Sequence, residues 1–151
     1  MIKPGKLFIG GEWVDARSGK TYDDINPATS AVTTKIAEAG KEDVEAAVQA
    51  ARRAQETGPW WNKMFAADRG KLIWKIGDLI SKYNDELAEL ETLDTGKPIS
   101  ETKKIDIPMS ADVFHYYAGA ASKMEGETIP IRGNFFNYTL REPLGVVGLI
   151  V

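Results

Sequence analysis

The chain has 151 residues, 43% of them hydrophobic and 27% charged, and its net charge of −3 provides no basic field for nucleic acid or anionic lipid. It has no cysteine and one histidine, which excludes disulfides, thiol catalysis and multi-histidine metal centres within these residues. No apolar run approaches the length of a membrane span, and no signal-peptide pattern follows Met1. We therefore expect a cytoplasmic protein without a membrane or nucleic-acid partner.

The first part of the chain is predicted to form short strands. Lys6–Ile9 and Glu12–Asp15 are β-prone runs that flank two glycines, the pattern of a hairpin with a two-residue turn. Two further β-prone runs follow at Thr21–Ile25 and Ala31–Ala37. An antiparallel hairpin region is the expected result.

Helical periodicity dominates the middle of the chain. It predicts helices over Lys41–Glu56, Ala66–Tyr83 and Asn84–Thr95, and another that starts near Pro98. We expect Pro108 to kink or restart this last helix, with Asp106 as its cap. The inward face of the second helix is expected to consist of Leu72, Ile73, Ile76, Ile80 and Tyr83.

The stretch Leu90–Pro98 ends one helix and starts another. Gly96 can take the left-handed conformation that stops a helix, and Asn84 can cap the start of this helix. Asp94 is then an acid near a helix C-terminus, where the dipole disfavours it. Two interpretations stay open. Either Asp94 is exposed or pairs with Lys97, or it is a cation ligand or a brace for a neighbouring loop.

Two other features have both a structural and a functional interpretation. Trp60 and Trp61 follow a Gly-Pro break, and they either cover a helix end or form an aromatic platform for a ligand. His115 lies on a helix near Ser110 and Asp112, but three residues within two turns do not converge as a catalytic triad. We expect a structural histidine, and no residue is assigned a catalytic role.

After residue 126 the hydrophobic period changes to two. Thr128–Arg132 and Phe135–Arg141 are strand candidates around a Gly-Asn turn. Gly145–Val151 is a continuous apolar run, typical of a parallel strand buried on both faces. Such a strand needs a crossover to its partner, so we expect a truncated α/β unit. An antiparallel strand covered by the helices is the alternative.

Several collinear motifs resemble the start of NAD(P)-dependent aldehyde dehydrogenases, especially the betaine-aldehyde-dehydrogenase-like branch. The motifs cover nearly the whole chain: Phe8–Val14, Ile25–Thr29, Leu90–Pro98, Tyr116–Gly119 and Arg141–Val147. Members of this family are several hundred residues long, so residues 1–151 resemble the N-terminal portion of such an enzyme. The resemblance implies part of a cofactor-binding domain and part of a bridging sheet through which the family oligomerises.

The resemblance also implies site residues. Aldehyde dehydrogenases attack the aldehyde with a cysteine thiolate that lies beyond Val151 in the family, so no catalytic residue is carried over. Ile150 and Val151 match positions that touch NAD or NADP. Ile25 and Asp94 match positions that hold a monovalent cation in some members. Phe135–Arg141 matches the bridging sheet and implies a homo-oligomer.

The predicted fold class is α+β, with an N-terminal β-hairpin region, a helical cluster and a C-terminal hairpin that leads into one strand of an incomplete, Rossmann-like α/β sheet. The predicted function is that of an N-terminal aldehyde dehydrogenase fragment, inactive alone, whose parent oxidises a small-molecule aldehyde. The alternative is a stand-alone, non-enzymatic assembly module. Such a module should carry charge or proline on its last strand, and Gly145–Val151 has neither.

Overall fold

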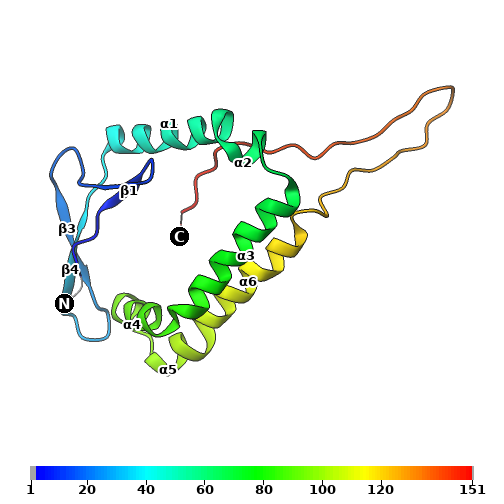
Figure 1. Cartoon of the computed structure of the whole chain (residues 1–151). Helices are drawn as coiled ribbons and strands as arrows, with labels where there is room; N and C mark the ends of the chain where they lie inside the picture. The colour runs from blue at the N-terminus through cyan, green and yellow to red at the C-terminus, as the bar shows by residue number, and fades with distance from the viewer. Residues whose placement is uncertain (1–2, 151) are drawn as a thin grey trace.

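A computed structural model of the chain describes residues 3–150 (Figure 1). Its mixed α/β architecture confirms the predicted fold class. Two antiparallel strand pairs precede a set of helices. The strands are β1 (Leu7–Ile9), β2 (Glu12–Val14), β3 (Thr21–Ile25) and β4 (Val32–Ala37). The helices are α1 (Lys41–Thr57), α2 (Pro59–Asn62), α3 (Ala66–Lys82), α4 (Asn84–Thr95), α5 (Ile99–Glu101), the π-helical η1 (Thr102–Asp106) and α6 (Ile107–Ala120).

Both strand pairs follow from local sequence. The predicted two-glycine turn joins β1 to β2, and both glycines have positive φ, which a side chain would oppose. In the second pair, Thr21 lies opposite Ala37, and an irregularity falls between Asp24 and Ile25. The pairing places Asp24 close to the end of the hairpin.

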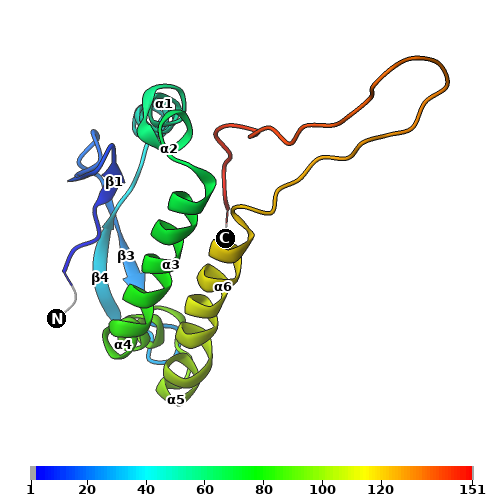
Figure 2. The same ribbon diagram turned by 45° about the vertical axis from the view of Figure 1, so that its right-hand side comes forward.

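The main helical contact joins α3 and α6, which run side by side in Figures 1 and 2. Glycines allow this close approach. A Cβ added at Gly70 would lie 2.8 Å from the Ala118 carbonyl oxygen. One added at Gly77 would lie 2.5 Å from the His115 ring and 3.0 Å from the Ala111 carbonyl oxygen. The two backbones therefore pack closer than larger residues would permit.

This contact corrects the predicted inward face of α3. The two buried residues of α3 are Gly70 and Gly77, whereas the larger apolar side chains of the predicted face remain partly exposed. Leu72, Ile76 and Tyr83 keep 45%, 43% and 46% of their surface exposed. Periodicity identified an apolar face, but the small residues determine which side meets α6.

One predicted helix cap is wrong, and the other, Asp106, precedes α6 as predicted but makes no capping hydrogen bond. Asn84 is the first residue of α4 and not its cap, and its side-chain amide donates to the Lys103 carbonyl oxygen. Asp106 has helical backbone angles within a continuous η1–α6 helix, and its carboxylate pairs with Lys97 at 2.7 Å. The π-helical segment directly precedes α6, whose first turn contains Pro108, and the helix continues through this proline without a break.

Residues 121–150 form an extended arm that leaves the helices and returns (Figure 1). A single antiparallel bridge joins Thr128 and Tyr138, and the Ile129 N–H donates to the Asn137 carbonyl oxygen. Within the described residues, the arm forms no strand apart from that bridge. The predicted strand over residues 145–150 is therefore absent. A buried parallel strand is stabilised by neighbours on both sides, and residues 3–150 offer this run none.

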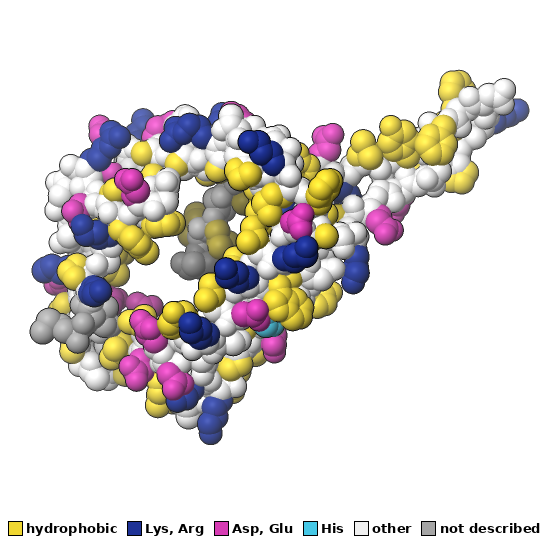
Figure 3. All heavy atoms as spheres, viewed as in Figure 1, with side chains coloured by type: hydrophobic (Ala, Val, Ile, Leu, Met, Phe, Trp, Pro, Cys, Tyr) yellow, Lys and Arg dark blue, Asp and Glu magenta, His cyan; other side chains and the backbone are white. Residues whose placement is uncertain are grey.

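The described chain is open. Its accessible surface is 12057 Å², whereas a compact monomer of its 16.6 kDa mass has about 7,600 Å² by the usual surface scaling. Figure 3 shows a hollow bounded by α1, the strands and α3, with hydrophobic side chains around it and along the arm. The buried apolar residues are mostly alanines. Much of the apolar surface of the described chain is therefore exposed to solvent.

Candidate functional site

The best-defined polar site lies where the β3–β4 hairpin meets the end of α4. Figures 1 and 2 both show the hairpin beside α4. The turn after β3 is fixed by Asn26, which is 8% exposed and accepts the Ala28 N–H on its side-chain oxygen at 2.8 Å. Its carbonyl oxygen accepts the Ser30 N–H at 2.8 Å. The sequence thus builds a rigid turn directly after Asp24 and Ile25.

Gly96 fits the end of α4 against this turn. Its φ of 75° ends the helix, as predicted, in the left-handed conformation. A Cβ added there would lie 2.9 Å from the Pro27 ring and 3.0 Å from the Ala28 nitrogen. Any larger residue would be both strained and too close. Helix end and turn are therefore held together, which brings Asp94 to β3.

Two carboxyl groups meet at this junction. The pKa of Asp94 is raised above its ordinary value, first by partial burial and then by the charge of Asp24 and a hydrogen bond to its side chain. Asp24 is held from the other side by the Thr33 hydroxyl, which contacts both its carboxylate and its carbonyl oxygen. The junction thus brings two carboxyl groups together, with the exposed Asp94 beside Asp24, and Lys3 lines the same groove.

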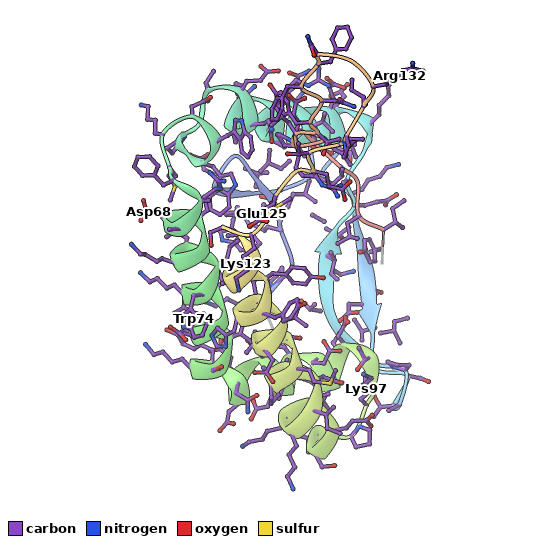
Figure 4. All side chains as sticks on the ribbon, turned by 90° about the vertical axis from the view of Figure 1, so that its right-hand side faces the viewer. Asp68, Trp74, Lys97, Lys123, Glu125 and Arg132 are labelled. Atoms are coloured by element: carbon purple, nitrogen blue, oxygen red, sulfur yellow. The ribbon has the colours of Figure 1, made fainter. Side chains whose placement is uncertain are left out.

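Lys97, the cation expected to pair with Asp94, forms an ion pair with a different acid. The Lys97 ammonium lies 2.7 Å from the Asp106 carboxylate, which raises the lysine pKa. The alternative that paired Lys97 with Asp94 is therefore wrong. A groove of about 390 Å³ opens beside the two acids, and Glu91 also lines it. Figure 4 shows Lys97 at the end of the molecule where α4 terminates.

The residues at this junction fit a hard cation. Asp24 and Asp94 provide carboxylate oxygens, and the C-terminal turn of α4 provides backbone carbonyls that lack helical partners. Ile25, the second predicted ligand, directly follows Asp24 and can contribute only its backbone carbonyl oxygen. Within residues 3–150 no group of three or more His, Cys, Asp or Glu side chains forms a metal cluster. The cation at Ile25 and Asp94 stays a prediction.

Of the two predicted cofactor contacts, the structure describes Ile150 alone. Ile150 is 98% exposed, and Val151 lies outside the described residues. An exposed aliphatic side chain at the end of an extended segment cannot enclose a dinucleotide. The residues present at this end of the chain therefore do not fit NAD(P) by themselves.

His115 has a structural environment that sequence spacing missed. Its Nε2 lies 3.1 Å from the Asp78 carboxylate, and its ring stacks on Trp74 at 4.4 Å between centroids. Ser110 instead donates its hydroxyl to the Asp106 carbonyl oxygen. The expected structural role of His115 agrees with this packing. Asp24 and Asp78 were missed because their partners come from elements that are distant in sequence.

No helix in residues 3–150 combines the length and apolar character needed to cross a bilayer.

Comparison with known proteins gives a consistent match along the chain. A family model described as "Aldehyde dehydrogenase family" matches residues 13–151. The mitochondrial aldehyde dehydrogenases of Mesocricetus auratus and Rattus norvegicus are 48% and 47% identical over 146 residues, which are 97% of this chain but 29% and 28% of theirs. The NAD+ complex structure of an aldehyde dehydrogenase from Bacillus cereus is 46% identical with a TM-score of 0.89, and the match covers 94% of this chain and 29% of that one.

Proposed function

The chain belongs to the aldehyde dehydrogenase family, and on that premise we propose that it supplies the N-terminal part of an enzyme that oxidises an aldehyde to a carboxylic acid with NAD(P)+. The observation that supports this most is the match of residues 13–151 together with a shared backbone at a TM-score of 0.89. The chain spans less than a third of the relatives it matches. Activity, substrate and partners of the whole enzyme are therefore part of the proposal.

The chain's contribution, in this proposal, is structural. It supplies part of the cofactor-binding domain and part of a bridging sheet for assembly into a cytoplasmic homo-oligomer. Ile150 and Val151 would contact NAD or NADP once further protein surface completes the pocket. The exposure of Phe135 and Phe136, 75% and 76%, supports an assembly role for the arm. A stand-alone assembly module, the alternative, has no comparison in its favour.

We propose that residues 1–151 alone do not oxidise aldehydes. The chain has no cysteine to form the covalent intermediate, and Ile150, one of its predicted cofactor contacts, is 98% exposed. The test mixes the purified chain with NAD+ or NADP+ and an aliphatic or betaine aldehyde and follows absorbance of the reduced cofactor. No formation above a heat-treated control is expected. Sustained formation that scales with protein concentration would contradict the proposal.

The second proposed role is a monovalent cation site at Ile25 and Asp94. A bound cation would offset the repulsion between Asp94 and Asp24, so it should stabilise the folded chain by mass action. Melting temperatures compared in potassium chloride and tetramethylammonium chloride of equal ionic strength test this. We expect a higher value in potassium for the wild type and no difference for Asp94→Asn. Equal melting temperatures for the wild type would remove the site.

A further inference from the structure

A second groove lies far from the Asp94 junction, where α2, the first turns of α3 and the end of α6 meet the returning arm. Its volume is about 500 Å³, within the range of pockets that hold small organic ligands. Figures 1 and 2 show the returning chain near the α2 end of α3. Aromatic and charged side chains share its lining: Trp60, Trp61, Tyr117, Arg69, Arg141 and Glu142.

Arg69 is a fixed cation in this groove. Its guanidinium lies 5.1 Å from the centre of the Trp61 ring, and its Nη1 donates to the Met64 carbonyl oxygen at 2.8 Å. A guanidinium has five N–H donors, so this bond leaves others for a ligand. The stacking and the hydrogen bond set the orientation of Arg69 before any ligand arrives.

Arg141, on the returning segment of the arm, adds a second arginine to the lining of this groove. Within residues 3–150, no ion pair joins Arg141 to an acid, although Glu142 lines the same groove. The lining therefore carries two positive charges and one negative charge, a net charge of one positive unit. A ligand with a single negative charge balances this arrangement, whereas a phosphate dianion would overcompensate and face Glu142.

The aromatic walls determine the rest of the ligand. Trp60, Trp61 and Tyr117 keep 42%, 47% and 61% of their surface exposed, so aromatic surface is available to a flat apolar body, with Arg69 over one face of the Trp61 ring. Guanidinium groups bind carboxylates in a bidentate manner. We propose that this groove binds a monocarboxylate with an aromatic body. The proposal is independent of the cation site and of aldehyde oxidation.

The test measures calorimetric binding of 1-naphthoate and of the uncharged 1-naphthamide to the 151-residue chain at low ionic strength. Naphthoate is expected to bind about tenfold more tightly, because charge-assisted hydrogen bonds are stronger than neutral ones. Arg141→Gln should remove most of this preference. The matched control is Arg132→Gln, since Figure 4 places Arg132 on the outlying loop of the arm, away from its base at Lys123 and Glu125.

Removing the acid tests the charge argument separately. Glu142→Gln should tighten naphthoate binding and leave naphthamide unchanged. Arg141 and Glu142 are exposed on an extended segment, so neither substitution removes core packing. Equal affinity for the two probes in the wild type, or an equal loss with Arg132→Gln and Arg141→Gln, would overturn the proposal.

Discussion

The α3–α6 pair and the arm of residues 121–150 differ in where their contacts come from. α3 packs against α6 through glycines. A side chain at these positions would collide with the facing backbone or with the His115 ring. The arm also carries many apolar residues, but Phe136, Leu144 and Leu149 are 76%, 96% and 84% exposed. The first region has its partner within the chain, while the second, apart from the stretch Arg141–Pro143 beside the helices, presents surface without one. The arm's apolar surface therefore needs a partner from outside the described residues if it is to be buried.

The largest expected effect comes from breaking the helical region at Gly77. In Gly77→Ala the new Cβ would collide with the His115 ring and the Ala111 carbonyl oxygen, so we expect a loss of about 1–3 kcal/mol in the free energy of unfolding. Gly119→Ala on α6 is the matched control, because a Cβ there has no atom within 4 Å. It should be neutral or slightly stabilising. Urea unfolding measures both, and equal losses would contradict close packing at Gly77.

A smaller effect on folding stability, which depends on pH, is expected at the junction of α4 and β3. The raised pKa of Asp94 means that ionisation is penalised in the folded chain more than in the unfolded chain. The penalty is absent below the ordinary value of 3.8 and grows as the pH rises through the folded-state pKa. Asp94→Asn removes it, so the variant should gain stability relative to wild type as the pH increases in potassium-free buffer.

The size of this gain is limited because Asp94 is largely exposed and solvent screens its charge. Asp112→Asn, which removes an exposed acid from α6, is the control. The measurement is the difference in melting temperature between variant and wild type from about pH 3.5 to pH 7, a range set by ordinary carboxyl titration. A difference that does not change with pH, or that changes equally in the Asp112 variant, would count against the Asp24–Asp94 interaction.

The smallest effect on folding stability is expected in the arm. Phe136→Ser should alter the free energy of unfolding by less than about 0.5 kcal/mol, since the ring is 76% exposed. It should nevertheless reduce self-association, because exposed apolar extended segments pair with other copies. Leu149→Lys should suppress aggregation through 145–151 and leave an assembly through 135–141 intact.

Light scattering across a concentration series tests this pair of variants. The wild type is expected to form assemblies larger than its 16.6 kDa monomer. A monodisperse wild-type monomer at high concentration would contradict association through either segment, 135–141 or 145–151. A stability loss in Phe136→Ser comparable to that of Gly77→Ala would show that the arm packs within the chain.

Sequence reasoning succeeded where the determinants were local. The bounds of Thr21–Ile25 and Asn84–Thr95 were predicted as the structure has them, and Gly96 ends its helix as expected. Turn residues such as Gly96 act over a few positions, so one sequence contains their signal. The predicted caps Asn84 and Asp106 make no capping hydrogen bond, because their side chains contact Lys103 and Lys97 instead. The other failures also depended on distant partners. Nothing near Asp94 in sequence indicates Asp24, and nothing near His115 indicates Asp78.

The α3 face shows a different limit. An apolar stripe identifies residues that prefer burial, but it does not identify which neighbour covers them. α6 instead approaches the side that carries Gly70 and Gly77, where the backbones can come closest. The predicted cation site has the same limitation, because the resemblance implied Ile25 and Asp94, whereas the second carboxylate became visible only with β3 placed beside α4.

Hydrogen exchange of the 151-residue chain, followed by mass spectrometry at a concentration where it does not associate, tests the contrast between the two regions most directly. We expect amides in the middle of α3 and α6 to be protected to the level of global unfolding, because their hydrogen bonds lie within packed helices. Amides of 143–150, which have no strand partner within the described residues, should exchange within seconds. Protection of 143–150 equal to that of α6 would contradict this account and show that the chain completes this segment by itself.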